Sequence, residues 1–80
     1  MSHEEILNLV KEYYEAEYQG TKSCIEKKYS WISPKDLVIN AINRCLGIMQ
    51  FVQYLGIPYE DLTVYDEYQE KLKSLLKGGN

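Results

Sequence analysis

Hydrophobic residues recur at helical spacing in three segments of the chain, which Pro34 and Pro58 separate. No stretch alternates apolar and polar residues as a half-buried strand would, and no Asn-Gly or Asp-Gly hairpin turn occurs. The connections between the segments are only a few residues long, which makes neighbouring helices pack antiparallel. The pattern therefore predicts one all-α domain over residues 1–80. We expect a three-helix antiparallel bundle with helices at about 2–29, 34–55 and 58–77.

The first segment contains a glycine that leaves two interpretations open. Ser2, with Glu5 three residues later, is the signature of a capping box and marks a helix start. Gly20 is an ordinary stop signal, but the apolar stripe keeps its phase beyond it, which favours one helix from Ser2 to about Tyr29. Gly20 would then cost ~1 kcal/mol relative to alanine. The alternative ends the helix at Gly20 and starts a short one at Ser23. The stripe consists of Ile6, Leu7, Val10, Tyr13, Tyr14, Tyr18, Thr21, Cys24, Ile25 and Tyr29.

Both later segments carry start and stop signals. Ser33 suits the N-cap with Pro34 at the first helical position, and Gly56 suits the residue just after the helix. The third helix is expected to begin at Pro58 and to stop at Gly78. It has one apolar and one charged side, so one side should be buried. Its ends carry the charges that the helix dipole favours, at Glu60, Asp61, Lys71, Lys73 and Lys77.

Beyond its first turn, the polar side of the middle helix contains no lysine and no carboxylate. A solvated helix side normally carries both, whereas amides, arginine and aromatics are typical of protein interfaces. Gly47, in mid-helix, would let another backbone approach closely. We therefore expect this charge-poor arc to be covered, either by the first helix or by a second copy of the chain. The arc consists of Asn40, Asn43, Arg44, Gly47, Gln50, Phe51 and Tyr54.

A further pattern links the first two helices. Glu17 falls on the apolar stripe of its own helix, where a charge is unexpected, and Arg44 is the only arginine in the chain. A turn centred near Ile32 would place Gly20 level with Arg44 and Glu17 level with Gly47. We predict that Glu17 and Arg44 form a structural ion pair, within the chain or across a dimer, between two close-packing glycines. Such a half-buried pair can set register more than it adds stability.

Composition argues against several functional classes. The net charge of −3 and the isoelectric point of about 5.0 give no global attraction for phosphates, so nucleic acid is an unlikely partner. A local basic-aromatic cluster is a possible anion contact: Lys22, Lys27, Lys28 and Lys35, with Tyr29 and Trp31 among them. The favoured interpretation is cations at a helix C-terminus. No basic recognition helix follows either turn, which excludes a helix-turn-helix protein.

Candidate chemistry is sparse. His3 lies near the terminus, so it serves neither as the base for a nucleophile nor as part of a zinc site. Cys24 and Cys45 fall on core stripes and are expected to be reduced thiols. The chain shows neither a signal peptide nor a bilayer-spanning segment, which favours a cytoplasmic protein without a membrane partner. Most of the eight tyrosines fall at core-facing spacing. We expect no catalytic residue, no metal and no cofactor.

These patterns favour a protein–protein interaction or assembly module that self-associates, most simply as a homodimer. A hydrophobic content of 45% excludes a disordered chain. The small core of an 80-residue domain also favours association between copies. The alternative is a small regulatory protein that contacts nucleic acid or an anionic partner through the Lys22–Lys35 cluster. The size and helical economy resemble those of small accessory proteins of bacteria and their phages, although no motif carries the resemblance.

Overall fold

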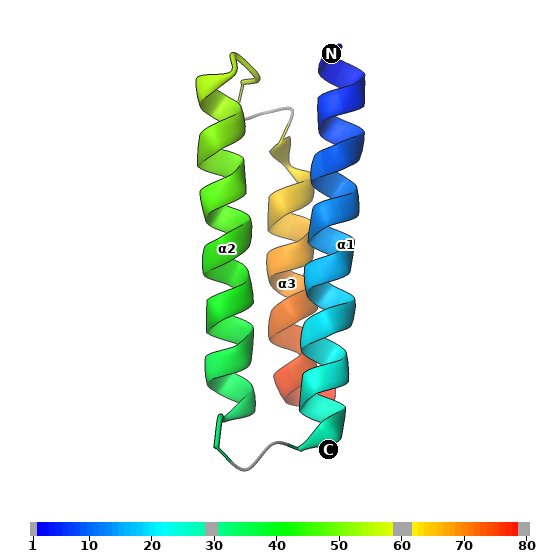
Figure 1. The fold of residues 1–80 in the computed structure, drawn as a ribbon, viewed down its shortest axis with the longest axis vertical. Coiled ribbons are helices and arrows are strands. Elements are labelled where there is room, and N and C mark those ends of the chain that lie inside the picture. The colour runs from blue at the N-terminus through cyan, green and yellow to red at the C-terminus, as the bar shows by residue number, and fades with distance from the viewer. Residues whose placement is uncertain (1, 29–30, 59–61, 79–80) are drawn as a thin grey trace.

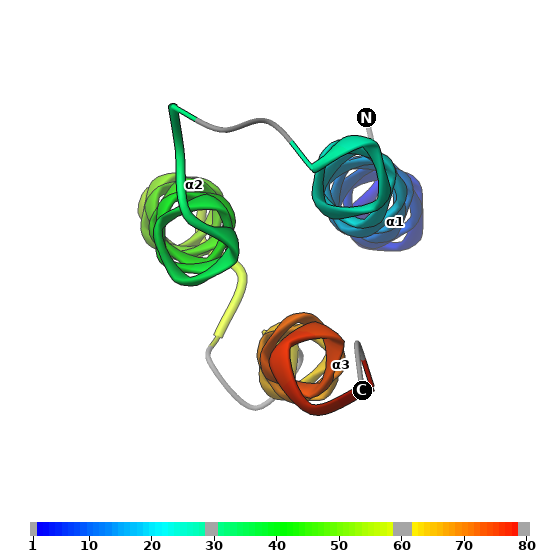
Figure 2. The same cartoon turned by 90° about the horizontal axis from the view of Figure 1, so that it is seen from below.

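The computed structural model describes residues 2–28, 31–58 and 62–78, which form three helices packed together. These are α1 (His3–Lys27), α2 (Pro34–Tyr54) and α3 (Val64–Gly78). In Figure 1, α1 runs from the top to the bottom, α2 returns to the top, and α3 runs down again behind them. The end view in Figure 2 shows the three helices at the corners of a triangle. The described residues contain no strand, so the predicted all-helical class is confirmed.

The predicted continuity of α1 through Gly20 is confirmed, and the alternative break at Gly20 is wrong. The capping box is also present: the Glu5 N–H donates to Ser2 Oγ, and the Ser2 N–H donates to Glu5 Oε1, both at 3.1 Å. The helix ends at Lys27 because Lys28 adopts a left-handed conformation, with φ of 54°. The predicted limit at Tyr29 lies outside the described residues. Apolar packing along the whole stripe is sufficient to carry the helix across the glycine.

The ends of α2 also follow the sequence signals. Ser33 is the N-cap, and its Oγ accepts a hydrogen bond of 3.1 Å from the Asp36 N–H. Pro34 occupies the first turn, where its missing N–H costs no helical hydrogen bond. Gly56 has φ of 96° and donates its N–H to the Gln53 carbonyl, as expected for a glycine that terminates a helix.

The predicted start of α3 at Pro58 is wrong, because the helix begins at Val64. The Thr63 carbonyl accepts the first hydrogen bonds of α3, from the N–H groups of Asp66 and Glu67. Ile57 and Leu62 are only 1% and 0% exposed. Both described flanks of the α2–α3 connection are therefore buried in the core, and the hydrogen bonds of α3 start only after Leu62. The predicted acidic first turn, at residues 60 and 61, lies outside the described residues.

The core lies where the three helices meet, and each helix contacts the other two. Tyr14 is its central side chain, fully buried against Tyr13, Tyr65 and Tyr68 with ring centroids 5.9–6.4 Å away. Its hydroxyl donates a long hydrogen bond of 3.4 Å to the Cys45 carbonyl. The other buried apolar residues are Val10, Val38, Ala41, Cys45, Met49, Val52, Ile57, Leu62 and Leu72.

Gly20 gives a first testable consequence of this fold. Its position is exposed within a continuous helix, and a Cβ there would meet no atom within 4 Å. Gly20→Ala is therefore expected to raise the free energy of unfolding by about 0.5–1 kcal/mol, because alanine loses less conformational freedom in a helix. Urea denaturation followed by circular dichroism measures the change. A destabilised variant would show that the backbone at Gly20 is not helical.

Candidate interaction surface

All seven residues of the charge-poor arc are exposed: Asn40, Asn43, Arg44, Gly47, Gln50, Phe51 and Tyr54. The expectation that the first helix covers the arc is therefore wrong, since α1 lies beside it and leaves it open. Within the described part of the chain, a Cβ at Gly47 or Gly20 would meet no atom within 4 Å. Neither glycine thus packs closely against any described residue of a single chain. A second copy is the remaining candidate to cover the arc.

The arc does not form one continuous site. Arg44 and Phe51 turn toward α1, and Asn40, Arg44, Gly47 and Phe51 follow one another at steps of three and four residues along one line of α2. Gln50 and Tyr54 line a separate shallow hollow with Gln53. Only the line facing α1 therefore joins a surface that two helices build.

That surface includes an apolar groove between the N-terminal half of α1 and the C-terminal half of α2, with a volume of about 290 Å³. Leu9, Phe51 and Leu55 are 50%, 57% and 55% exposed there. Sequence reasoning missed the contribution of Leu9, which lies off the main stripe of α1. Its apolar character at that position was the available signal. The groove is lined chiefly by Ile6, Leu9, Tyr13, Ile48, Phe51 and Leu55.

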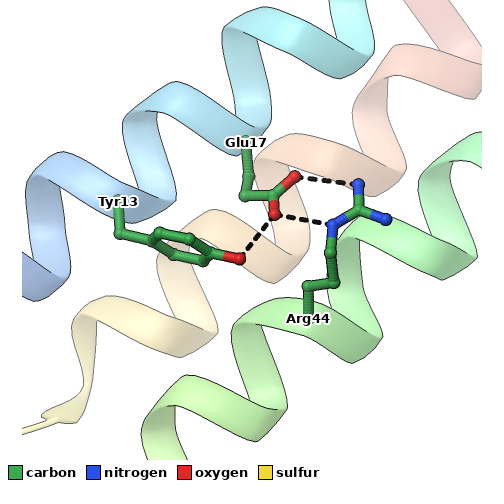
Figure 3. Close-up of polar contacts among 3 residues, drawn as sticks. All are labelled: Tyr13, Glu17 and Arg44. Carbon is green, nitrogen blue, oxygen red and sulfur yellow. Dashed lines mark hydrogen bonds and ion pairs between the residues drawn. The ribbon is translucent and has the colours of Figure 1, made fainter.

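Glu17 and Arg44 form their predicted ion pair within the chain, next to the groove (Figure 3). Arg44 Nε lies 2.6 Å from Glu17 Oε2, and Arg44 Nη2 lies 2.9 Å from Glu17 Oε1, so the pair is bidentate. The Tyr13 hydroxyl, one helical turn away, donates to the same Oε2 at 2.7 Å. This third contact was not predicted, although the spacing of four residues in α1 permits it. Glu17 is only 14% exposed and Arg44 is 52% exposed.

These contacts shift the proton affinities of all three groups. The hydrogen bonds from Arg44 lower the pKa of Glu17 from its ordinary value of 4.5, and the Tyr13 hydroxyl adds to this effect against the opposing effect of burial. The same contacts raise the pKa values of Arg44 and of Tyr13. The site therefore holds an ionised, mutually compensated pair at neutral pH.

Glu17→Gln is expected to lower the free energy of unfolding at neutral pH by about 0.5–1 kcal/mol, because a partly exposed pair is screened by water. A folded pKa below 4.5 means that the ionised pair contributes stability above that value. The contribution disappears as the pH falls through the folded pKa, so the difference between variant and natural chain should shrink as the pH is lowered below 4.5. Urea denaturation from neutral to acidic pH measures it. In a double-mutant cycle with Arg44→Gln, a coupling energy near zero would refute the pair.

A second polar cluster joins α1 to α3 and was not predicted. The Tyr68 hydroxyl donates to Glu15 Oε1 at 2.5 Å, and Lys71 Nζ lies 3.8 Å from the same oxygen. Lys71 Nζ also lies over the rings of Tyr18 and Tyr68, at 4.9 and 4.6 Å from their centroids. The hydrogen bond to Glu15 raises the pKa of Tyr68 to about 12. This cluster fixes α3 against α1 on the side away from the groove.

The four lysines proposed as an anion contact are all exposed. Lys22 and Lys27 belong to α1, Lys28 is its C-cap, and Lys35 is in the first turn of α2. Trp31 is 77% exposed, and Tyr29 lies outside the described residues. The lysines thus gather at one end of the molecule, where they also suit the C-terminal dipole of α1.

The cysteines are free thiols, as expected. Cys45 is 1% exposed, and burial raises its pKa to about 11, which makes it unreactive at neutral pH. Cys24 is half-buried. Among the described tyrosines, Tyr14, Tyr65 and Tyr68 are buried, while Tyr54 is 92% exposed.

Within the described residues, none of the helices combines the length and the apolar character needed to cross a bilayer. Histidine, cysteine and carboxylate side chains in that part of the chain form no group of three that could hold a metal ion. The chain was compared with protein-family models, curated proteins and solved structures, and none of them matches.

Proposed function

We propose that this chain is a non-catalytic protein–protein interaction module that self-associates as a homodimer. The observation that carries the proposal is the open side of the α1–α2 pair, which we call the α1–α2 face. It comprises the apolar groove, the Glu17–Arg44 pair, and the α2 line of Asn40, Gly47 and Phe51. The face is turned away from α3 and toward the viewer in Figure 1.

The apolar content of the face supports this proposal. Leu9, Phe51 and Leu55 each remain about half exposed although they lie together. Full burial of such a side chain contributes roughly 1.5–3 kcal/mol, so each could still gain about half of that on association. Exposed apolar residues that gather in one recess, rather than scattering singly, mark interaction sites.

The charges of the face also suit a second copy. The chain carries a net charge of −3, so two copies repel each other at long range unless their charges are arranged to compensate. On the α1–α2 face, Arg44 is neutralised by Glu17 of the same chain. Covering this pair therefore leaves neither of its two charges without a partner, which is the costly outcome at an interface.

The dimensions of the molecule limit the size of an interface on the α1–α2 face. The Cα atoms extend 41 Å by 19 Å across the view of Figure 1. This outline of the whole molecule sets an upper bound on the face, and that bound is close to the roughly 800 Å² that each partner contributes to an interface of standard size.

A substitution at Gly47 tests the proposed self-association. Gly47→Leu should leave a single chain folded, because the position is open and helical. The added side chain would obstruct a close approach of a second copy, so light scattering at micromolar concentration should report dimers for the natural chain and monomers for Gly47→Leu. Lys73→Leu, which adds the same side chain to exposed α3, is the control and should remain dimeric. A natural chain that is monomeric with full helicity would refute the proposal.

The second candidate is a small regulator that contacts nucleic acid or another anionic partner through the Lys22–Lys35 cluster. One observation favours it: the C-terminal end of α3 reaches the same end of the molecule and adds Lys73 and Lys77. Binding of single-stranded nucleic acid that weakens steeply with salt would support it. Absence of a mobility shift at low salt would exclude it.

A further inference from the structure

The charges of the molecule are separated along its length. Contacts between the helices define the middle of the molecule along its long axis. Arg44 of α2 contacts Glu17 of α1, and Tyr68 and Lys71 of α3 contact Glu15 of α1. Above that middle in Figure 1, the described carboxylates outnumber the single cation Lys11; they are Glu4, Glu5, Glu12, Asp66 and Glu67. Glu70 lies between Tyr68 and Lys71 and so belongs to the middle. Below the middle, the lysines outnumber Glu26 and Asp36; they are Lys22, Lys27, Lys28, Lys35, Lys73 and Lys77. One end of the molecule is therefore acidic and the other basic.

Two hollows lie between α1 and α2, one toward each end. The apolar groove lies toward the acidic end. A smaller crevice of about 160 Å³ lies at the turn, at the basic end, and its lining includes Cys24, Ile32 and Leu37. Leu9 and Cys24 lie eight residues before and seven residues after Glu17 in α1. The two hollows are thus nearly equidistant from the Glu17–Arg44 pair.

We propose that the second copy packs on the α1–α2 face in the opposite direction, with the two-fold axis close to the Glu17–Arg44 pair. This inference rests on the proposed self-association and specifies its geometry. The apolar groove of each copy then lies over the turn crevice of the other, with Phe51 and Leu55 directed at the partner's crevice. The acidic end of each copy lies beside the basic end of the other.

The alternative is a parallel alignment, in which both copies point the same way, and the charges disfavour it. It would place the two acidic ends side by side and the two basic ends side by side. Each like-charged contact at about 4 Å costs roughly 1 kcal/mol even in water, and charges within about 8–10 Å still interact at physiological salt. The face is isologous in either alignment, so the charge separation selects between them.

Spin-label distances distinguish the alignments. Cys24→Ser removes the accessible native thiol, and buried Cys45 should not react at neutral pH. Single cysteines are then introduced in separate variants at the exposed positions His3 and Gln19. His3 lies fourteen residues from Glu17, so at 1.5 Å per residue the opposed arrangement places the two His3 labels about 40 Å apart. The two Gln19 labels should lie within about 25 Å, because packed helices are separated by about 8–10 Å.

The outcomes separate this inference from the proposed function. A long His3→Cys distance with a short Gln19→Cys distance supports the opposed dimer. Two short distances would show a dimer whose copies point the same way, which overturns this inference and preserves self-association. A long distance at both positions, in a sample of dimeric mass, would place the interface elsewhere. Absence of dipolar coupling in both labelled variants, together with a monomeric natural chain, would refute both proposals.

Discussion

Tyr14→Ala is expected to leave the chain largely unfolded at room temperature. Tyr14 is 0% exposed and contacts three other tyrosine rings from α1 and α3, while its hydroxyl reaches α2. Removing a buried aromatic side chain costs about 3–5 kcal/mol, through lost burial and the cavity that remains. A domain of this size rarely has more than about 3–5 kcal/mol of stability from its core. This one substitution should therefore remove most of the stability of the fold.

Tyr14→Phe is the matched control for this prediction. It keeps the ring and removes a hydrogen bond of 3.4 Å to a carbonyl within α2, so we expect a loss of less than about 1 kcal/mol. Circular dichroism during urea denaturation measures both variants. If Tyr14→Ala unfolds within 1 kcal/mol of the natural chain, Tyr14 is not at the centre of the core.

Leu9→Glu is expected to abolish self-association while the single chain stays folded. Leu9 is 50% exposed in the apolar groove, so a carboxylate there reaches water in the monomer. In the dimer the same carboxylate would be withdrawn from water into an apolar groove, at a cost of several kcal/mol. At about 1.4 kcal/mol for each tenfold change, the dissociation constant should rise by at least a hundredfold.

Leu76→Glu is the control for Leu9→Glu, because it makes the same exchange at a leucine that is 41% exposed on α3. It should leave the dissociation constant unchanged within a few-fold. Sedimentation equilibrium over a concentration series measures both variants. Equal effects of the two substitutions would mean that general charge, rather than the α1–α2 face, controls association.

Local sequence signals located most of the fold. The caps at Ser2 and Ser33 and the glycine at Gly56 depend on hydrogen bonds within a few residues, which a sequence displays directly. The start of α3 could not be found in this way. Leu62 falls in phase with the stripe of α3, so its burial in the preceding connection depends on the packing of Ile57 against the assembled core.

Only the α2 half of the candidate surface could be predicted from the sequence. The absence of Lys and carboxylates identified the α2 line, and the isolated charge of Glu17 identified its partner Arg44. The α1 half of the groove could not be identified, because whether Leu9 faces the core or an open recess depends on the spacing between α1 and α2. Phe51 lines the groove whereas Gln50 lines a separate hollow, and this difference likewise depends on the rotation of α2 about its axis.

The most direct test of self-association through the α1–α2 face is an isotope-filtered NMR measurement on a mixture of ¹³C-labelled and unlabelled chains. It detects contacts between side chains of different copies. We predict intermolecular contacts at Leu9 and Phe51, and none at Leu76 of α3. A sample whose mass equals that of the 9.4 kDa monomer, with no intermolecular contact at Leu9 or Phe51, would contradict the account.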